Sequence, residues 1–255
     1  MNKSEQSGQR PSVKRRGIYL LPNLLTTCGL FAGFYSIIAA IDGNFVNSAV
    51  AIFVAMFLDG LDGRVARMTS TASEFGKEFD SLADMVSFGL APAIVTYQWG
   101  VERLAEYGAV WGRLGWLAAF LYVAAAAFRL ARFNTDVGWT DRRFFQGLAS
   151  PAAAACIAAM VWVSTAYGID GLVALVAGIS ITAALAVLMM SRFSYLSFKD
   201  VKPGRRVRYT QLLVIPLVIV VISIEVPAVT FGLAILYAAS GPAVWIWRRS
   251  RRGSR

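Results

Sequence analysis

Apolar segments long enough to cross a lipid bilayer recur along almost the whole of this 255-residue chain. A helix rises about 1.5 Å per residue, so about 20 apolar residues cross the roughly 30 Å hydrocarbon core of a membrane. Hydrophobic residues make up 57% of the chain and charged residues 16%, which excludes an ordinary soluble domain. The sequence therefore predicts an all-α integral membrane protein with about eight transmembrane helices. The expected segments are residues 20–41, 45–68, 81–99, 114–133, 149–167, 170–190, 210–224 and 228–247.

The positions of the lysines and arginines predict how these segments are oriented. If the N-terminus is cytoplasmic and all eight segments cross the membrane, every one of the 25 basic residues except Arg103 and Arg113 falls on the cytoplasmic side. Basic residues concentrate in the cytoplasmic loops of membrane proteins, so both termini are predicted to be cytoplasmic. The formal net charge of +10 is then explained by contact with anionic lipid headgroups, and no nucleic-acid partner is expected.

Three polar, basic stretches flank or interrupt the apolar segments. Residues 1–17 lack the apolar core and the small-residue cleavage site of a signal peptide, and we expect a disordered cytoplasmic tail there. Residues 191–209 are expected to form a basic cytoplasmic loop, and residues 248–255 a basic C-terminal tail. Both are interpreted as anchors to anionic headgroups and not as parts of a catalytic site.

Four aspartates lie within two consecutive apolar segments, where charged side chains are costly. Asp59 and Asp62 are three residues apart, so both project from one face of their helix. Asp80 and Asp84 are four residues apart, with the same consequence. The short connection makes the two helices antiparallel neighbours, so the pairs can face each other. One aspartate at the bilayer centre costs about 3 kcal/mol and repulsion adds to this, so a cation is expected among the four.

The available ligand types indicate which cation this is. The chain has no histidine, and Cys28 and Cys156 lie far apart without the spacing of metal ligands. Carboxylate oxygens without nitrogen or sulfur ligands favour a hard cation. We therefore expect Mg²⁺ or Mn²⁺ in preference to Zn²⁺.

Small residues and an arginine accompany the first aspartate pair. Gly63 and Ala66 remove side-chain bulk where a ligand would approach the backbone, and the guanidinium of Arg67 matches phosphate oxygens. With a metal ion, these residues are typical of a pyrophosphate site. The alternative is that the aspartates only form ion pairs that hold the helices together. The arginines available for such pairs are Arg64, Arg67, Arg129 and Arg132.

The stretch from Asp59 to Asp84 resembles the signature of the CDP-alcohol phosphatidyltransferases. That signature reads Asp-x-x-Asp-Gly-x-x-Ala-Arg, eight residues, then Gly-x-x-x-Asp-x-x-x-Asp, and every fixed position is matched. The resemblance implies that Asp59, Asp62 and Asp80 bind metal. It implies that Asp84 contributes to the metal site and also removes the proton of the acceptor hydroxyl. The residues that it implies for the CDP moiety are Gly63, Arg67 and Ser73.

The same resemblance implies an architecture and a location. Its six-helix core, with an active site open to the cytoplasm, would occupy residues 18–190 of this chain. Residues 210–247 would form two additional transmembrane helices. Members of this family are commonly dimeric, so the expectation is a homodimer. The compact, arginine-rich chain suggests a bacterial source, and on that assumption the expected location is the cell inner (plasma) membrane.

Segments around the signature resemble the phosphatidylserine synthase branch of that family. Asn23 and Thr26, at the start of the first apolar segment, either line the nucleotide pocket or cap the helix. Arg129 and Arg132 are three residues apart and share a helix face, so they either dock a phosphate or a serine carboxylate or anchor the helix at the membrane surface. The segments that carry the resemblance are residues 22–26, 80–92, 128–134 and 145–151.

The expected reaction is transfer of a phosphatidyl group from CDP-diacylglycerol to L-serine, which gives phosphatidylserine and CMP. The same chemistry with glycerol 3-phosphate, inositol phosphate or choline as acceptor is the nearest alternative. A cation-coupled transporter would also place aspartates inside the membrane, and a noncatalytic lipid-binding scaffold is a third possibility. The intact signature argues against the scaffold, and the lack of broken helices in matched halves argues against the transporter.

Overall fold

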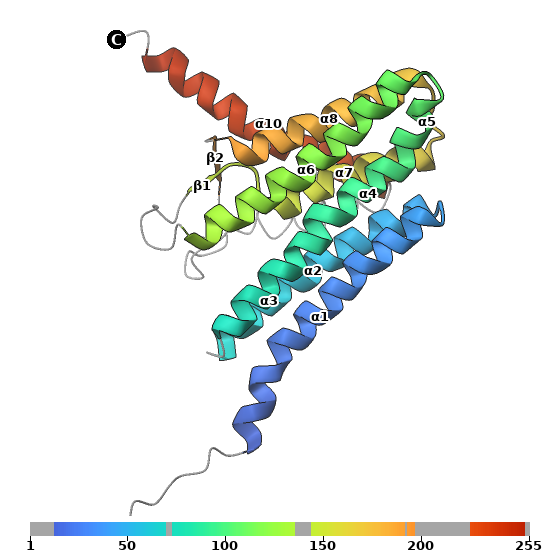
Figure 1. Ribbon diagram of the computed structural model, residues 1–255. Coiled ribbons are helices and arrows are strands. Elements are labelled where there is room, and N and C mark those ends of the chain that lie inside the picture. Colours follow the sequence, from blue (N-terminus) through green and yellow to red (C-terminus); the bar gives the residue numbers. More distant parts are fainter. Residues whose placement is uncertain (1–12, 70–72, 136–143, 192, 197–224, 253–255) are drawn as a thin grey trace, which may run out of the picture.

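The structure, a computed structural model, describes residues 13–69, 73–135, 144–191, 193–196 and 225–252. Long helices dominate it (Figure 1). The helices α3 (Glu74–Asp84), α4 (Ala91–Thr96) and α5 (Glu102–Ala105) form one continuous rod. Two π-helical turns, η1 (Met85–Leu90) and η2 (Tyr97–Val101), join them. The helices are α1 (Val13–Ile41), α2 (Phe45–Thr69), α3 (Glu74–Asp84), α4 (Ala91–Thr96), α5 (Glu102–Ala105), α6 (Ala109–Thr135), α7 (Ser150–Ala166), α8 (Leu172–Met190) and α10 (Val226–Arg252).

Within the described residues, six helical segments are long and apolar enough to cross a membrane, so the chain is a multi-pass helical membrane protein. The seventh apolar helix, α7, has only 17 residues. The expected span 210–224 lies outside the described residues. Eight crossings and cytoplasmic termini therefore stay predictions. The six segments are Leu20–Ile41, Phe45–Thr69, Glu74–Ala105, Ala109–Thr135, Leu172–Met190 and Val226–Trp245.

The third spanning segment begins earlier than its apolar residues predict. The sequence places its start near residue 81, whereas α3 begins at Glu74. Ser73 is the N-cap of this helix, and its side-chain oxygen accepts a hydrogen bond of 3.0 Å from the backbone N–H of Gly76. The first turns of α3 are strongly amphipathic, so hydropathy alone misses them. The added turns extend the helix that carries Asp80.

Small residues let α1 and the rod approach each other closely. A Cβ atom at Gly33 would lie 2.8 Å from Cα of Ser87 on η1, which is too close for any side chain. One turn earlier on α1, the backbone oxygen of Gly29 accepts a hydrogen bond of 3.3 Å from the Ser87 hydroxyl. Glycines four residues apart at a helix crossing are the expected means of association within lipid. This contact holds α1 against η1, beside the aspartates of α3.

The alanine-rich helix α7 lies at the centre of the protein. Most of its alanines and its Cys156 are buried, with almost no surface accessible to solvent. α7 packs against α2 on one side and α10 on another. Small side chains permit this close packing, as their abundance in the apolar segments predicts.

Two three-residue strands, which the all-α prediction omits, precede α7 and follow α8. β1 (Phe144–Gln146) and β2 (Ser194–Leu196) pair antiparallel, with Phe145 opposite Tyr195. Gly147 follows β1 with φ of 82°, a left-handed conformation that glycine adopts at no steric cost. Such short strands have no periodic pattern that sequence reasoning could detect. They fix the chain just before the first residue of α7, Ser150.

Candidate active site

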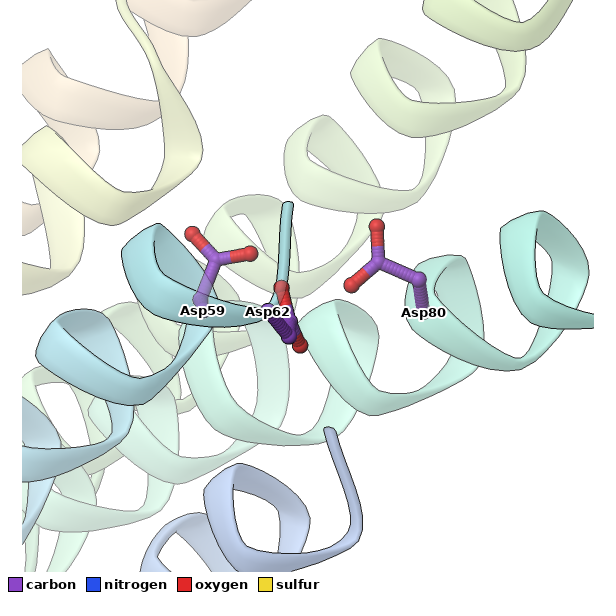
Figure 2. Close-up of side chains that lie close together, drawn as sticks. All are labelled: Asp59, Asp62 and Asp80. Atoms are coloured by element: carbon purple, nitrogen blue, oxygen red, sulfur yellow. The ribbon is translucent and has the colours of Figure 1, made fainter. Parts of the chain in front are cut away.

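Helices α2 and α3 bring three of the four aspartates together. One carboxylate oxygen from each of Asp59, Asp62 and Asp80 lies within 4.8 Å of the others. Figure 2 shows the Asp59 and Asp80 carboxylates pointing toward each other from opposite helices, with Asp62 between them. Asp62 is buried, with 4% of its surface exposed, and the other two are half-buried. The 3-residue spacing on α2 therefore produces the shared face that it predicts.

This donor set fits a hard divalent cation. Oxygens that share one Mg²⁺ ion at about 2.1 Å are at most about 4.2 Å apart, so carboxylates within 4.8 Å need only a small adjustment. All three donors are oxygens, and neither nitrogen nor sulfur ligands accompany them in the described part of the chain. The cluster is therefore able to bind a metal ion of the kind expected.

Asp84 lines the same small cavity as the three clustered aspartates. The cavity has a volume of about 10 Å³, close to the space that one water molecule or ion requires. It lies where α1, α2, α3 and η1 meet. The lining residues are Thr26, Gly29, Leu30, Ala55, Asp59, Asp62, Asp80, Ala83, Asp84, Ser87 and Phe88.

Ion pairing with arginine does not account for this arrangement. Within the described residues, none of Asp62, Asp80 and Asp84 forms an ion pair with an arginine within 4.0 Å. Arg129 interacts with Asp84 electrostatically, but over a longer distance. The purely structural alternative is therefore not supported for these three aspartates.

Thr26 on α1 contacts the cluster directly. Its hydroxyl lies 2.6 Å from Oδ2 of Asp62, to which it donates, and 3.1 Å from the backbone oxygen of Pro22. Both groups are buried, so the hydrogen bond fixes the orientation of the Asp62 carboxylate. Thr26 and Asn23 lie well inside α1, which begins at Val13, so the alternative that they cap this helix is wrong.

Asn23 lies across from the beginning of α3. A Cβ atom at Gly76 would be 3.2 Å from its Oδ1 and 3.1 Å from Oγ of Ser73. The absence of a side chain at Gly76 thus leaves room for two polar groups from different elements. Ser73 itself is exposed and caps α3, a structural role that sequence reasoning did not assign to it.

Gly63 directly follows Asp62 on α2, and Ala66 and Arg67 lie about one turn further along. A Cβ atom at Gly63 would lie 3.4 Å from Nη1 of Arg67, so the guanidinium lies over the glycine. Arg67 is exposed and Ala66 is half-buried. An exposed guanidinium beside uncovered backbone is able to bind phosphate oxygens.

The two arginines of α6 have different surroundings. Nη1 of Arg129 donates a hydrogen bond of 2.6 Å to Oγ of Ser150, whereas its Nε is buried and has no hydrogen-bond partner among the described residues. Arg132 is exposed and donates to Oε1 of Gln146. Of the two predicted acceptor-binding arginines, Arg129 is the one whose charge acts on Asp84.

Asn134, at the same end of α6, is a site residue that sequence reasoning did not single out. Its Nδ2 donates a hydrogen bond of 3.0 Å to Oγ of Ser81, the residue that follows Asp80. This contact ties the end of α6 to α3 beside the cluster. Its position in the segment 128–134, which carries the family resemblance, is the only signal that could have identified it.

Comparisons with known proteins agree with this geometry. Residues 19–190 match the family model for CDP-alcohol phosphatidyltransferase. The chain is 38% identical over 231 residues to the CDP-diacylglycerol–serine O-phosphatidyltransferase of Helicobacter pylori strain J99, covering 90% of this chain and 92% of the relative. It is 33% identical over 177 residues to the archaetidylserine synthase of Methanothermobacter thermautotrophicus, covering 69% of each. The chain therefore belongs to the CDP-alcohol phosphatidyltransferase family.

Proposed function

We propose that this protein transfers the phosphatidyl group of CDP-diacylglycerol to the hydroxyl of L-serine, giving phosphatidylserine and CMP. The observation that carries the reaction class is the acidic cavity on α2 and α3, where four aspartates in the family signature meet. The acceptor is inferred from relatives named CDP-diacylglycerol–serine O-phosphatidyltransferase, one of which matches 90% of this chain.

In this proposal Asp59, Asp62 and Asp80 hold Mg²⁺ or Mn²⁺, and Asp84 contributes to the metal site. A bound cation would neutralise the pyrophosphate and polarise its phosphorus. Thr26 acts through Asp62, because its hydrogen bond keeps one carboxylate oxygen in a fixed direction. The carboxylates come from two separate helices, so the relative position of α2 and α3 sets the geometry of the site.

Asp84 is proposed as the base. It lines the cavity one helical turn beyond Asp80, where the serine hydroxyl would enter. Asp84 takes the hydroxyl proton, the serine oxygen forms a bond to the β-phosphorus, and the bond from that phosphorus to CMP breaks. Arg129 lies within electrostatic range of Asp84, and its buried Nε is suited to hold the serine carboxylate.

The CDP moiety would lie along the exposed end of α2 and the start of α3. Gly63, Ala66 and Arg67 provide backbone access and a guanidinium. Ser73 and Asn23, which both approach Gly76, provide polar atoms on the opposite side.

An apolar groove of about 360 Å³ supports a lipid-linked substrate. It follows α2 from Val50 to Leu58 and shares no lining residue with the acidic cavity, which lies on a different face of this helix. We propose that an acyl chain of the CDP-lipid occupies it. The lining residues are Val50, Phe53, Val54, Phe57, Leu58, Trp162, Val226 and Thr230.

The proposal also covers the domain organisation, the oligomeric state and the location of the enzyme. Residues 18–190 would form the catalytic core and residues 210–247 two additional helices, in a homodimer within the cell inner membrane. The active site would face the cytoplasm, where serine is soluble and the released CMP can diffuse away. Chemical cross-linking in native membranes tests the dimer.

The test is CMP release by detergent-solubilised protein supplied with CDP-diacylglycerol and Mg²⁺ or Mn²⁺. Serine, glycerol 3-phosphate, inositol phosphate and choline are added in separate reactions, with EDTA as the metal-free control. Serine-dependent release that EDTA abolishes supports the whole proposal. Release with a different acceptor refutes serine as the acceptor and keeps the reaction class. If folded protein releases no CMP with any acceptor, the proposed phosphatidyltransferase activity is refuted.

A further inference from the structure

Two contacts between α6 and the rod fix the position of Arg129 relative to the acidic cavity. On one side of it along α6, Cβ of Ala126 lies 3.3 Å from the place that a Cβ atom would take at Gly89 of η1. On the other side, Asn134 donates its hydrogen bond of 3.0 Å to Ser81 of α3. Ala126 and Arg129 are three residues apart and share a helix face. Arg129 therefore lies opposite the end of α3, which lines the acidic cavity.

The buried hydroxyl of Ser150 holds the side chain of Arg129 at this level. Ser150 is the first residue of α7 and is 0% exposed, and its Oγ accepts the 2.6 Å hydrogen bond from Nη1 of Arg129. A hydrogen bond from a charged donor is shorter and stronger than one between neutral groups, so this contact restrains the guanidinium. Its Nε is buried and has no partner among the described residues. A buried donor of this kind is suited to an acceptor oxygen that a ligand supplies.

The chain that leads to Ser150 is itself held firmly in place by the end of α8. The backbone N–H of Gly147 donates a hydrogen bond of 2.9 Å to the oxygen of Phe193, and that of Leu148 donates one of 3.1 Å to the oxygen of Leu188. The side chain of Leu148 is completely buried. Ser150 thus belongs to a rigid segment, and its hydroxyl presents a fixed acceptor to α6.

We propose that Ser150 is a positioning residue that prepares Arg129 for an anionic acceptor, which is the carboxylate of L-serine in the proposed reaction. The hydroxyl engages Nη1 of the guanidinium. The other edge of that planar group is formed by Nε and Nη2, whose parallel N–H donors match the two oxygens of a carboxylate. Because Nη1 is held, this edge keeps one orientation before the acceptor arrives. The inference rests on the proposed function, because it assigns Ser150 to the acceptor half of that same site.

Steady-state kinetics of Ser150→Ala test this proposal, because alanine removes only the hydroxyl oxygen. We expect KM for L-serine to rise about fivefold or more, with KM for CDP-diacylglycerol and kcat each changed less than about twofold. Ser164→Ala is the matched control, since it makes the same change at a buried serine near the other end of α7. It should change none of the three constants.

The choice between acceptors separates positioning from a general defect. L-serinamide carries a carboxamide in place of the carboxylate, so it loses the charged half of the contact with Arg129. The ratio of kcat/KM for L-serine to that for L-serinamide should fall about fivefold in Ser150→Ala and stay within about twofold of wild type in Ser164→Ala. If L-serinamide binds without turnover, its inhibition constant replaces its KM in the comparison.

A second variant serves if Ser150→Ala does not fold. Ser150→Cys nearly keeps the side-chain volume and replaces the hydroxyl by a weaker acceptor, so KM for L-serine should rise in the same direction. An unchanged KM for L-serine in a folded Ser150 variant would overturn the proposal. An equal loss of kcat/KM for L-serine and L-serinamide would overturn it as well, because a structural defect predicts that result.

The wild-type protein alone reports on the proposed function, through the acceptor that it uses. If that acceptor is glycerol 3-phosphate or inositol phosphate, the assignment of serine fails. A rise of KM for that phosphate in Ser150→Ala, with KM for CDP-diacylglycerol unchanged, would then still support the positioning role of Ser150.

Discussion

At the residue scale, the proposed function gives the four aspartates of the acidic cavity separable roles. Asp84→Asn is expected to lower kcat at least about 100-fold, because it removes the base, while CDP-diacylglycerol binding changes less than about threefold. Asp59→Asn is expected to weaken metal binding and CDP-diacylglycerol binding together, by about 10-fold or more. CMP release and calorimetric binding in detergent measure the two effects.

Asp42→Asn is the matched control, because Asp42 is exposed in the turn between α1 and α2, away from the cavity. It should leave both measurements unchanged. If Asp84→Asn and Asp59→Asn lose CDP-diacylglycerol binding to the same extent, the division between base and metal ligand is wrong.

Thr26 offers a second test at the same scale. Thr26→Ala removes the 2.6 Å hydrogen bond to the buried Asp62, so we expect about 10-fold more Mn²⁺ to be required for half-maximal activity. Thr26→Ser keeps the hydroxyl and should stay within about threefold of wild type. A titration of CMP release against Mn²⁺ gives both values, and equal values for the alanine and serine variants would contradict the role of the hydroxyl.

The sequence predicts the acidic cluster because spacings of three and four residues within a helix determine a shared face. It identifies Thr26 only as a candidate for the nucleotide pocket, since its contact with Asp62 joins residues 36 positions apart. Helical spacing also places Arg129 and Arg132 on one face, but it does not predict that the Arg129 Nε is buried while Arg132 is exposed. That difference depends on β1 and α7, which contact the two arginines through Gln146 and Ser150.

At the element scale, the crossing of α1 and η1 depends on the missing side chain of Gly33. Gly33→Ala would place a methyl group against the Ser87 backbone, and we expect it to destabilise the protein by about 1–3 kcal/mol. The midpoint of thermal unfolding in detergent should fall by about 5 °C or more. Gly232→Ala on α10 is the control, because nothing lies within 4 Å of its Cβ position. Equal midpoints for the two variants would show that the contact is not tight.

The groove along α2 is tested by filling it. Val54→Trp should raise KM for CDP-diacylglycerol with long acyl chains several-fold, with a smaller effect for a short-chain analogue that does not reach the groove. Val187→Trp on α8 places the same side chain at an exposed position outside the groove. A similar KM for long-chain substrate in both variants would exclude an acyl chain from this surface.

Elements with a strong apolar pattern are well predicted, and elements without one are not. The predicted start of α2, residue 45, agrees with the start in the structure at Phe45. The start of α3 is missed by seven residues, because its first turns are polar and are stabilised by the Ser73 cap. The strands β1 and β2 escape prediction because their pairing joins segments that α7 and α8 separate.

At the scale of the whole molecule, the proposed orientation places the turn between α5 and α6 outside and the start of α3 inside. Arg103, one of the two basic residues expected outside, forms an ion pair with Asp170 in the turn between α7 and α8. α5 and the start of α3 lie at opposite ends of the rod (Figure 1). The few basic residues at the outer end are thus accompanied by acidic ones.

Labelling of single cysteines checks this orientation. In a background with Cys28→Ala and Cys156→Ala, Glu106→Cys should react with a membrane-impermeant maleimide in intact cells. Lys77→Cys should react only after the membrane is permeabilised, because both positions are exposed in the protein and the proposed orientation places them on opposite sides of the bilayer. The reverse pattern would place the active site outside the cytoplasm and contradict the proposed topology.

The π-helical turn η1 connects the aspartates of its rod to residues that bond with α1 and α6. Asp80 and Asp84 precede it, whereas Phe88, whose backbone oxygen accepts a hydrogen bond of 3.0 Å from Tyr122, lies within it. A single-residue deletion at Val86 would rotate the following residues by about 100° relative to the aspartates. The carboxylates would keep their place facing α2, while the partners of Ser87 and Phe88 would be lost. The wide turn thus acts as a phase shift that lets one helix line the acidic cavity and also bring Phe88 to Tyr122 of α6.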